Sequence, residues 1–83
     1  MIVKIFWQPN CPYCPKAKKL GEDLKKDGIN VEFYNVKEVD GLAEASFFNV
    51  LSTPSVIIVN GNKEIASWRG NTPKKEEIKN FFK

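Results

Sequence analysis

The sequence contains no histidine and only two cysteines, Cys11 and Cys14. A structural zinc site is closed by four ligands drawn mostly from cysteine and histidine, so one copy of the chain has too few soft ligands to close one. We therefore expect no metal. The chain also lacks a long hydrophobic run, because Met1 leads directly into Ile2–Trp7, which has only the length of a strand. These absences argue against a metal centre and against a membrane partner, and they favour a cytoplasmic protein.

Arginine occurs once, at Arg69, although the net charge is +3. Much of the positive charge lies in residues 16–26, where Glu22 and Asp23 interrupt a run of lysines. A mixed-sign, lysine-rich segment is typical of a solvated helix face, so we expect no nucleic-acid partner. The 83 residues suffice for one core, and we expect a single domain over residues 1–83 that acts as a monomer.

Cys11, Pro12, Tyr13 and Cys14 form the only cluster of reactive side chains in the sequence. Two cysteines three residues apart at the start of a helix lie on one face of its first turn, where a disulfide can form and break without large backbone movement. In a reducing cytosol such a lone pair is more often catalytic than structural. The motif therefore predicts a dithiol that switches reversibly to a disulfide.

The position of the two cysteines also predicts which sulfur attacks. A thiolate at a helix N-terminus faces unpaired backbone N–H groups, which lower its pKa, and Cys11 lies there. Cys14 lies one turn further in, where neighbours shield it, and suits the resolving role. Lys16, Lys18 and Lys19 add positive potential nearby.

Hydrophobic periodicity and turn residues predict seven elements. They are a strand at 2–7, a helix at 16–26 ending before Gly28, a strand at 30–36, a helix at 42–49, a strand at 55–59, a hairpin turn at Asn60-Gly61 with a strand at 63–69, and a last helix that Thr72 caps and Pro73 opens. In the second helix Leu42, Ala45 and Phe48 form the apolar face, and in the last one Ile78, Phe81 and Phe82 do.

Pro15 conflicts with a regular helix that starts at Pro12, because it removes an N–H where the first intrahelical bond is needed. Either the first turn is irregular or regular helix begins near Pro15. We expect the second, or a mixture of both, so that Cys11 lies slightly ahead of the helix end and the helix dipole acts on it less strongly. The order strand, helix, strand, helix, strand, strand, helix predicts the thioredoxin fold, an α/β fold with a four-stranded mixed sheet and three helices on its two faces.

With that order, residues 6–14 and Thr53-Pro54 resemble the glutaredoxin and thioredoxin family over the whole chain, and CPYC is the glutaredoxin active-site tetrapeptide. The resemblance implies a thiol-disulfide oxidoreductase with Cys11 and Cys14 as catalytic residues and no cofactor. It further implies that Pro54 is the family's cis-proline beside the two cysteines, and that Thr53 offers its backbone to an extended substrate. Pro12 and Tyr13 complete the implied substrate-binding set, since Tyr13 has little room to be buried.

The resemblance is divided between the two branches of the family. Glutaredoxins that resemble this chain have a lysine where Gln8 stands, and a Gly-Gly pair with an acidic residue where Gly70-Asn71-Thr72 stands; those groups hold glutathione. Phe6-Trp7 and a single glycine after the last strand resemble thioredoxin, although the buried aspartate of thioredoxins falls here on Ile5. We therefore expect protein disulfides as substrates and a thioredoxin-reductase-type flavoprotein as the electron donor, with glutathione as the alternative.

Two other functions compete with this prediction. In an iron–sulfur carrier, two copies bridge a cluster through Cys11 and glutathione, but cluster-binding relatives carry a smaller residue than Pro12. In a binding module the cysteines are incidental, and Cys11→Ser leaves its function intact. Trp68 is expected to pack in or beside the core. Arg69 is expected to be an exposed rim residue, although its guanidinium suits a carboxylate.

Overall fold

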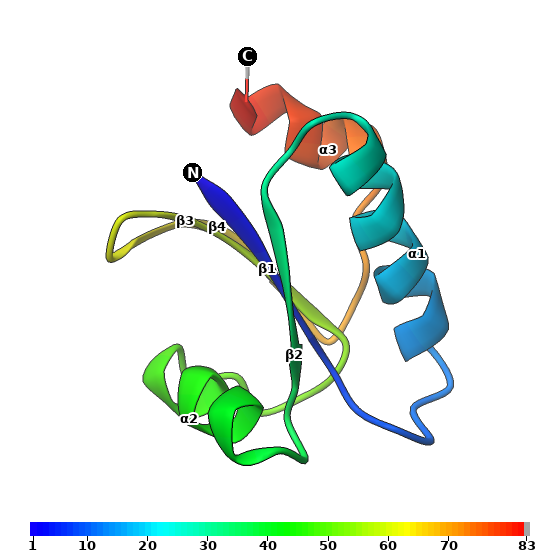
Figure 1. Ribbon diagram of the computed structural model, residues 1–83, viewed down its shortest axis with the longest axis vertical. Helices are drawn as coiled ribbons and strands as arrows, with labels where there is room; N and C mark the ends of the chain where they lie inside the picture. Colours follow the sequence, from blue (N-terminus) through cyan, green and yellow to red (C-terminus); the bar gives the residue numbers. More distant parts are fainter. Residues whose placement is uncertain (83) are drawn as a thin grey trace.

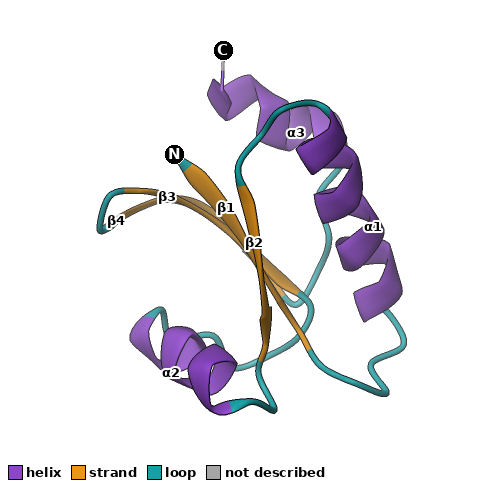
Figure 2. Ribbon diagram, in the orientation of Figure 1, coloured by secondary structure: helices purple, strands orange, loops and turns teal. Residues whose placement is uncertain are grey.

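The computed structural model describes residues 1–82 and has the predicted order of elements. They are β1 (Ile2–Trp7), α1 (Cys14–Lys26), β2 (Val31–Asn35), α2 (Val39–Phe47), β3 (Ser55–Asn60), β4 (Lys63–Arg69) and α3 (Lys75–Lys79), which continues as a 3-10 turn, Asn80–Phe82. The strands form one mixed sheet in the order β2-β1-β3-β4 (Figure 2). β1 pairs with β2 in parallel, and β3 pairs antiparallel with both β1 and β4. The thioredoxin fold is confirmed.

Helices cover both faces of the sheet, with α1 and α3 on one side and α2 on the other (Figure 1). Alternation along β1 sends Val3 and Ile5 into the core beneath α1 and α3, while Phe6 joins Ala45 of α2 in a second core. Strand β3 is buried on both faces, as its continuous β-branched run predicts. Within residues 1–82, no helix has both the length and the apolar character to cross a membrane.

Helix α1 begins at Cys14, within one residue of the alternative that placed its start near Pro15. Pro15 occupies the second helical position, where the backbone N–H has no intrahelical acceptor in any helix, so its missing N–H costs nothing. At the other end of α1, Asp27 accepts hydrogen bonds from Lys75 and Lys79 of α3, at 3.2 and 3.1 Å, which join the two helices.

The predicted start of the second helix at Leu42 is wrong, because α2 begins at Val39 and contains Gly41. A Cβ atom on Gly41 would lie 1.9 Å from the carbonyl oxygen of Asn35. The glycine therefore lets the helix backbone lie against the end of β2 and does not break the helix. The predicted apolar face is only partly buried: Ala45 and Phe48 lie in the core, but Leu42 is 56% exposed.

Two further boundaries differ from the prediction. The hairpin loop is Gly61-Asn62, one residue later than predicted, because β3 continues through Asn60 and a register shift follows Ile58. The predicted cap at Thr72 and start at Pro73 are wrong: the last helix begins at Lys75, and its N-cap is Lys74, whose backbone is extended at φ −77° and ψ 153°.

The start of α3 is capped from within its own first turn. The Lys74 N–H donates to the Glu77 carboxylate at 2.8 Å. Of the predicted apolar residues of this helix, Ile78 is buried and Phe81 is 38% exposed, packing edge-on against Trp68.

Candidate active site

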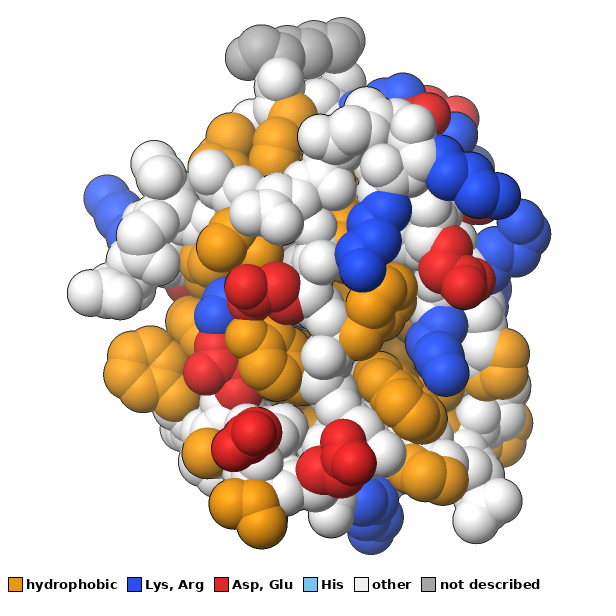
Figure 3. Space-filling view, in the orientation of Figure 1, with side chains coloured by type: hydrophobic (Ala, Val, Ile, Leu, Met, Phe, Trp, Pro, Cys, Tyr) orange, Lys and Arg blue, Asp and Glu red, His pale blue; other side chains and the backbone are white. Residues whose placement is uncertain are grey.

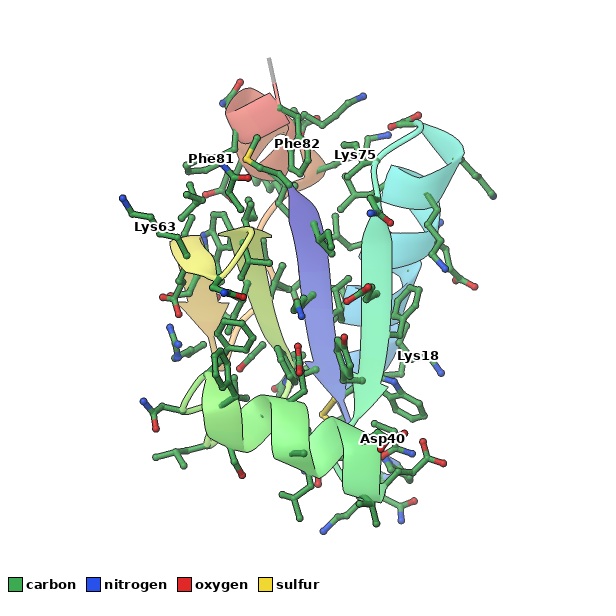
Figure 4. All side chains as sticks on the ribbon, turned by 60° about the vertical axis from the view of Figure 1, so that its left-hand side comes forward. Lys18, Asp40, Lys63, Lys75, Phe81 and Phe82 are labelled. Atoms are coloured by element: carbon green, nitrogen blue, oxygen red, sulfur yellow. A yellow bond between two sulfur atoms is a disulfide. The ribbon has the colours of Figure 1, made fainter. Side chains whose placement is uncertain are left out.

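Cys11 and Cys14 form a disulfide at the carboxyl end of β1, visible as the yellow bond in Figure 4. Their Cα atoms are 5.3 Å apart, and the Cys14 N–H donates to the Cys11 carbonyl at 3.2 Å. Asn10, which precedes Cys11, has a φ of 62°, a left-handed conformation that asparagine adopts more readily than most residues. The two cysteines therefore lie in a tight turn between β1 and α1.

The two cysteines differ in burial in the order that the sequence predicts. Cys11 is partly exposed, whereas Cys14 is 2% exposed in the first turn of α1. Pro12 is exposed and Tyr13 is 74% exposed, so the residues between the cysteines face solvent at the tip of the turn. A sulfur of a second molecule therefore reaches Cys11 more readily than Cys14.

Cys11 lies three residues ahead of the first residue of α1, so the helix dipole acts on it from a distance. A nearer polar group is the Thr53 hydroxyl, which donates to the Cys11 sulfur at 3.7 Å. Of the nearby lysines, Lys18 lies over the Trp7 ring, 3.9 Å from its centroid, and Lys19 pairs with Asp23 at 3.5 Å. The Lys18 contact joins α1 to the end of β1 on either side of the active-site turn.

The peptide bond between Thr53 and Pro54 is cis, as the resemblance implies. Pro54 is fully buried, and Thr53 is partly exposed beside Cys11. The structure thus brings Cys11, Cys14 and Thr53 together across 42 residues of sequence.

Arg69 and Gly70, at and just after the end of β4, donate hydrogen bonds to the chain before and within this loop. The Arg69 guanidinium donates to the Phe48 carbonyl at 2.8 Å and to the Glu64 carboxylate at 3.0 Å. The hydrogen bond from Arg69 lowers the pKa of Glu64, although its partial burial acts in the opposite direction. Arg69 is therefore an exposed residue, as predicted, whose guanidinium joins β4 to the end of α2.

A groove of 290 Å³ opens beside the site and was not anticipated from the sequence. Its apolar walls come from Val36, Leu42, Val50 and Leu51, and Thr53 links it to Cys11. Leu51 is 96% exposed, and Figure 3 shows hydrophobic side chains on the surface in the region of α2. No pattern in the sequence marks Leu51, which immediately precedes Ser52, as part of a groove.

Other surfaces offer less chemistry. Figure 3 shows blue and red side chains intermixed along the edge formed by α1. Among residues 1–82 there is no group of three or more histidine, cysteine, aspartate or glutamate side chains placed to hold a metal ion.

Comparison with known proteins connects this geometry to a family. A thioredoxin-domain family model matches residues 1–83. The chain is 36% identical over 59 residues to a probable thioredoxin of Archaeoglobus fulgidus, covering 70% of this chain and 65% of that protein. It is 32% identical over 65 residues to a thioredoxin of Methanocaldococcus jannaschii, covering 75% and 73%. A glutaredoxin 1 of Salmonella typhimurium is 34% identical over 56 residues, covering 65% and 63%.

Solved structures agree in fold. Thioredoxin-2 of a malaria parasite has a TM-score of 0.81 at 19% identity, covering 98% of this chain and 79% of that one. A thioredoxin of Halobacterium salinarum has a TM-score of 0.80 at 18% identity, covering 96% and 69%. The family match, together with the Cys11–Cys14 pair, supports thiol-disulfide oxidoreductase activity. The chain therefore belongs to the thioredoxin-domain family.

Proposed function

We propose that this protein reduces disulfide bonds in other proteins through a reversible Cys11–Cys14 disulfide. The observation that carries the proposal is the difference in burial between a partly exposed Cys11 and a shielded Cys14. The Cys11 thiolate attacks one sulfur of the substrate disulfide, and the other substrate sulfur leaves as a thiolate. Cys14 then loses its proton and attacks the Cys11 sulfur, which releases the second substrate sulfur. Two electrons pass to the substrate, and the Cys11–Cys14 disulfide remains.

Substitution of each cysteine tests these roles. Cys14→Ser keeps the attacking thiol and should accumulate a mixed disulfide with substrate, visible by mass spectrometry. Cys11→Ser should neither turn over nor trap. Trapping by the Cys11 variant and not by the Cys14 variant would reverse the assignment.

The groove beside Thr53 is the proposed binding site for an extended segment of the substrate protein. Because Thr53 both lines the groove and hydrogen-bonds to the Cys11 sulfur, a chain whose disulfide meets Cys11 passes over the groove. Pro12, Tyr13, Thr53 and Pro54 would contact that chain next to its cysteine. Recognition would then rest on apolar contact with Leu42 and Leu51.

Leu51→Ser should raise the KM for a protein disulfide and leave the reduction of a small aromatic disulfide unchanged. Val39→Ser is the matched control, since Val39 is 84% exposed on α2 and does not line the groove. Equal effects of the two substitutions would contradict the groove assignment.

We further propose a thioredoxin-reductase-type flavoprotein as the electron donor. Glutathione carries two carboxylates and an amine, and Gln8 and the Asn71-Thr72 pair offer neither a cation nor an acid to hold them. Hydrogen bonds to charged groups contribute about 1.5 to 3 kcal/mol each, so the loss of two corresponds to roughly a hundredfold or more in affinity. A flavoprotein needs a complementary surface and access to the disulfide.

Glutathione remains the second candidate because the chain has the CPYC motif and resembles glutaredoxins at 34% identity. Parallel assays separate the two donors: NADPH with a thioredoxin reductase, against NADPH with glutathione and glutathione reductase. Turnover with glutathione alone would make the protein a glutaredoxin in function. The same proposal includes a cytoplasmic location and a monomeric state for this protein.

A further inference from the structure

Ser55, the first residue of β3, is a polar side chain buried completely within the core. Its hydroxyl donates to the Ser52 carbonyl at 2.7 Å and accepts the Gly70 N–H at 3.4 Å. The Gly70 N–H also donates to the Pro54 carbonyl at 3.0 Å. One buried hydroxyl thus joins β3, the end of β4 and the loop of residues 52–54.

The loop and the end of β4 also pack closely. Gly70 has a φ of 83°, and a Cβ atom on it would lie 3.3 Å from the Ser52 hydroxyl oxygen. The carbonyls of Ser52 and Pro54, on either side of Thr53, are therefore both held by hydrogen bonds. Thr53 is the residue between these two fixed points, and its hydroxyl donates to Cys11.

We propose that Ser55 is a positioning residue for Cys11, holding the backbone of residues 52–54 so that the Thr53 hydroxyl stays directed at the Cys11 sulfur. In the reduced protein this hydroxyl donates to the Cys11 thiolate, and a hydrogen bond to the charged form lowers the pKa of the thiol. Ser55 thereby raises the fraction of Cys11 that is ready to attack, without touching substrate.

A serine that only stabilised the fold would affect melting temperature and leave the thiol unchanged. The readout is therefore the pH dependence of Cys11 alkylation by iodoacetamide in a Cys14→Ser background, where Cys11 is the only thiol. Ser55→Ala should raise the pKa of the Cys11 thiol. At pH values below the pKa of the unsubstituted protein's Cys11 thiol, the alkylation rate should fall about two- to tenfold, as expected when one hydrogen bond to the charged sulfur is weakened but not removed.

Two variants make the test specific. Ile58→Val removes buried volume from the same strand in the core beneath α1, so it should lower stability and leave the thiol pKa unchanged. Thr53→Val removes the donating hydroxyl. If Ser55 acts through Thr53, then adding Ser55→Ala to Thr53→Val changes the thiol pKa no further.

Gly70→Ala perturbs the same loop from the end of β4, because its Cβ would crowd the Ser52 hydroxyl. This variant replaces Ser55→Ala in the test if Ser55→Ala does not fold. It should also raise the thiol pKa. An unchanged thiol pKa in a folded Ser55→Ala protein, or additive effects of the Ser55 and Thr53 substitutions, would overturn the proposal. The assay contains no electron donor and no protein substrate, so its outcome is independent of the donor and substrate proposed above.

Discussion

Lys4 provides a quantitative test of how α2 is attached to the sheet. It lies in the middle of β1 with its side chain 13% exposed, and its ammonium forms an ion pair with Glu44 of α2 and lies 3.6 Å from Glu32. The rings of Tyr34 and Phe48 are each 5.3 Å from it. Burial alone would lower the pKa of Lys4, but the hydrogen bond to Glu44 and the nearby carboxylates raise it overall, so the side chain is charged at neutral pH.

Lys4→Met leaves the Glu44 carboxylate, 26% exposed, without its main partner. Breaking a fully buried pair costs about 3 to 5 kcal/mol and breaking an exposed one about 0 to 1 kcal/mol. This pair lies between those limits, so we expect a loss of about 2 kcal/mol. For a domain of this size that corresponds to a Tm lower by roughly 8 to 16 °C.

Thermal and urea unfolding of the oxidised protein, followed by circular dichroism, measure this loss. Lys19→Met is the matched control, because Lys19 is 76% exposed in its pair with Asp23 and should change stability by less than about 0.5 kcal/mol. The double variant Lys4→Met/Glu44→Leu replaces the pair by apolar groups and should recover most of the loss. Equal effects of Lys4→Met and Lys19→Met would refute the reasoning.

Three further predictions concern pH and packing. Burial, with a hydrogen bond that its hydroxyl donates to a neighbouring carboxylate, raises the pKa of Tyr34 to about 12, so its contribution to stability is present below pH 10 and is lost between about pH 10 and 12; Tyr34→Phe should flatten that decline in a pH series of unfolding curves. Hydrogen bonds from two lysines of α3 lower the pKa of Asp27, so its contribution is present above its ordinary pKa and is lost as the pH falls through the lower, folded value; Asp27→Asn should remove that acid-side loss in the same titration. Gly41→Ala should destabilise far more than Gly28→Ala in urea unfolding, because its Cβ meets the Asn35 carbonyl, whereas the Gly28 position is open and costs roughly 1 kcal/mol of positive-φ strain.

The elements that the sequence predicts well are those whose signal is local. The β-branched run of β3 and the helical spacing of Ala17, Leu20 and Leu24 depend only on neighbours along the chain, and both were located to within a few residues. The start of α2 was misplaced because a glycine after an aspartate usually ends or precedes a helix. Here Gly41 allows close contact between α2 and the end of β2, and no local sequence pattern predicts a contact of this kind.

The candidate site likewise combines residues that local sequence predicts with residues that only the folded structure brings together. The spacing of Cys11 and Cys14 and the shielding of Cys14 follow from local sequence. The approach of Thr53 to Cys11 spans 42 residues, and only resemblance to a family indicated it. Ser55 had a faint signal as the one polar residue in a buried β-branched run, but its partners at Ser52 and Gly70 become visible only when three segments meet.

The positions of the charged side chains around Cys11 are relevant to the identity of the electron donor. Arg69, the residue best suited to a carboxylate, already binds Glu64 and the Phe48 carbonyl, and Lys18 lies over the Trp7 ring. To hold a glutathione carboxylate, either of these side chains would have to leave its contact, whereas Lys37 lines the groove and is exposed. Apolar surface around Leu51 requires no such rearrangement to receive a protein chain. The apolar wall of the groove thus supports the proposed protein partner, and among residues 1–82 Lys37 is the one lining residue of the groove that carries a positive charge.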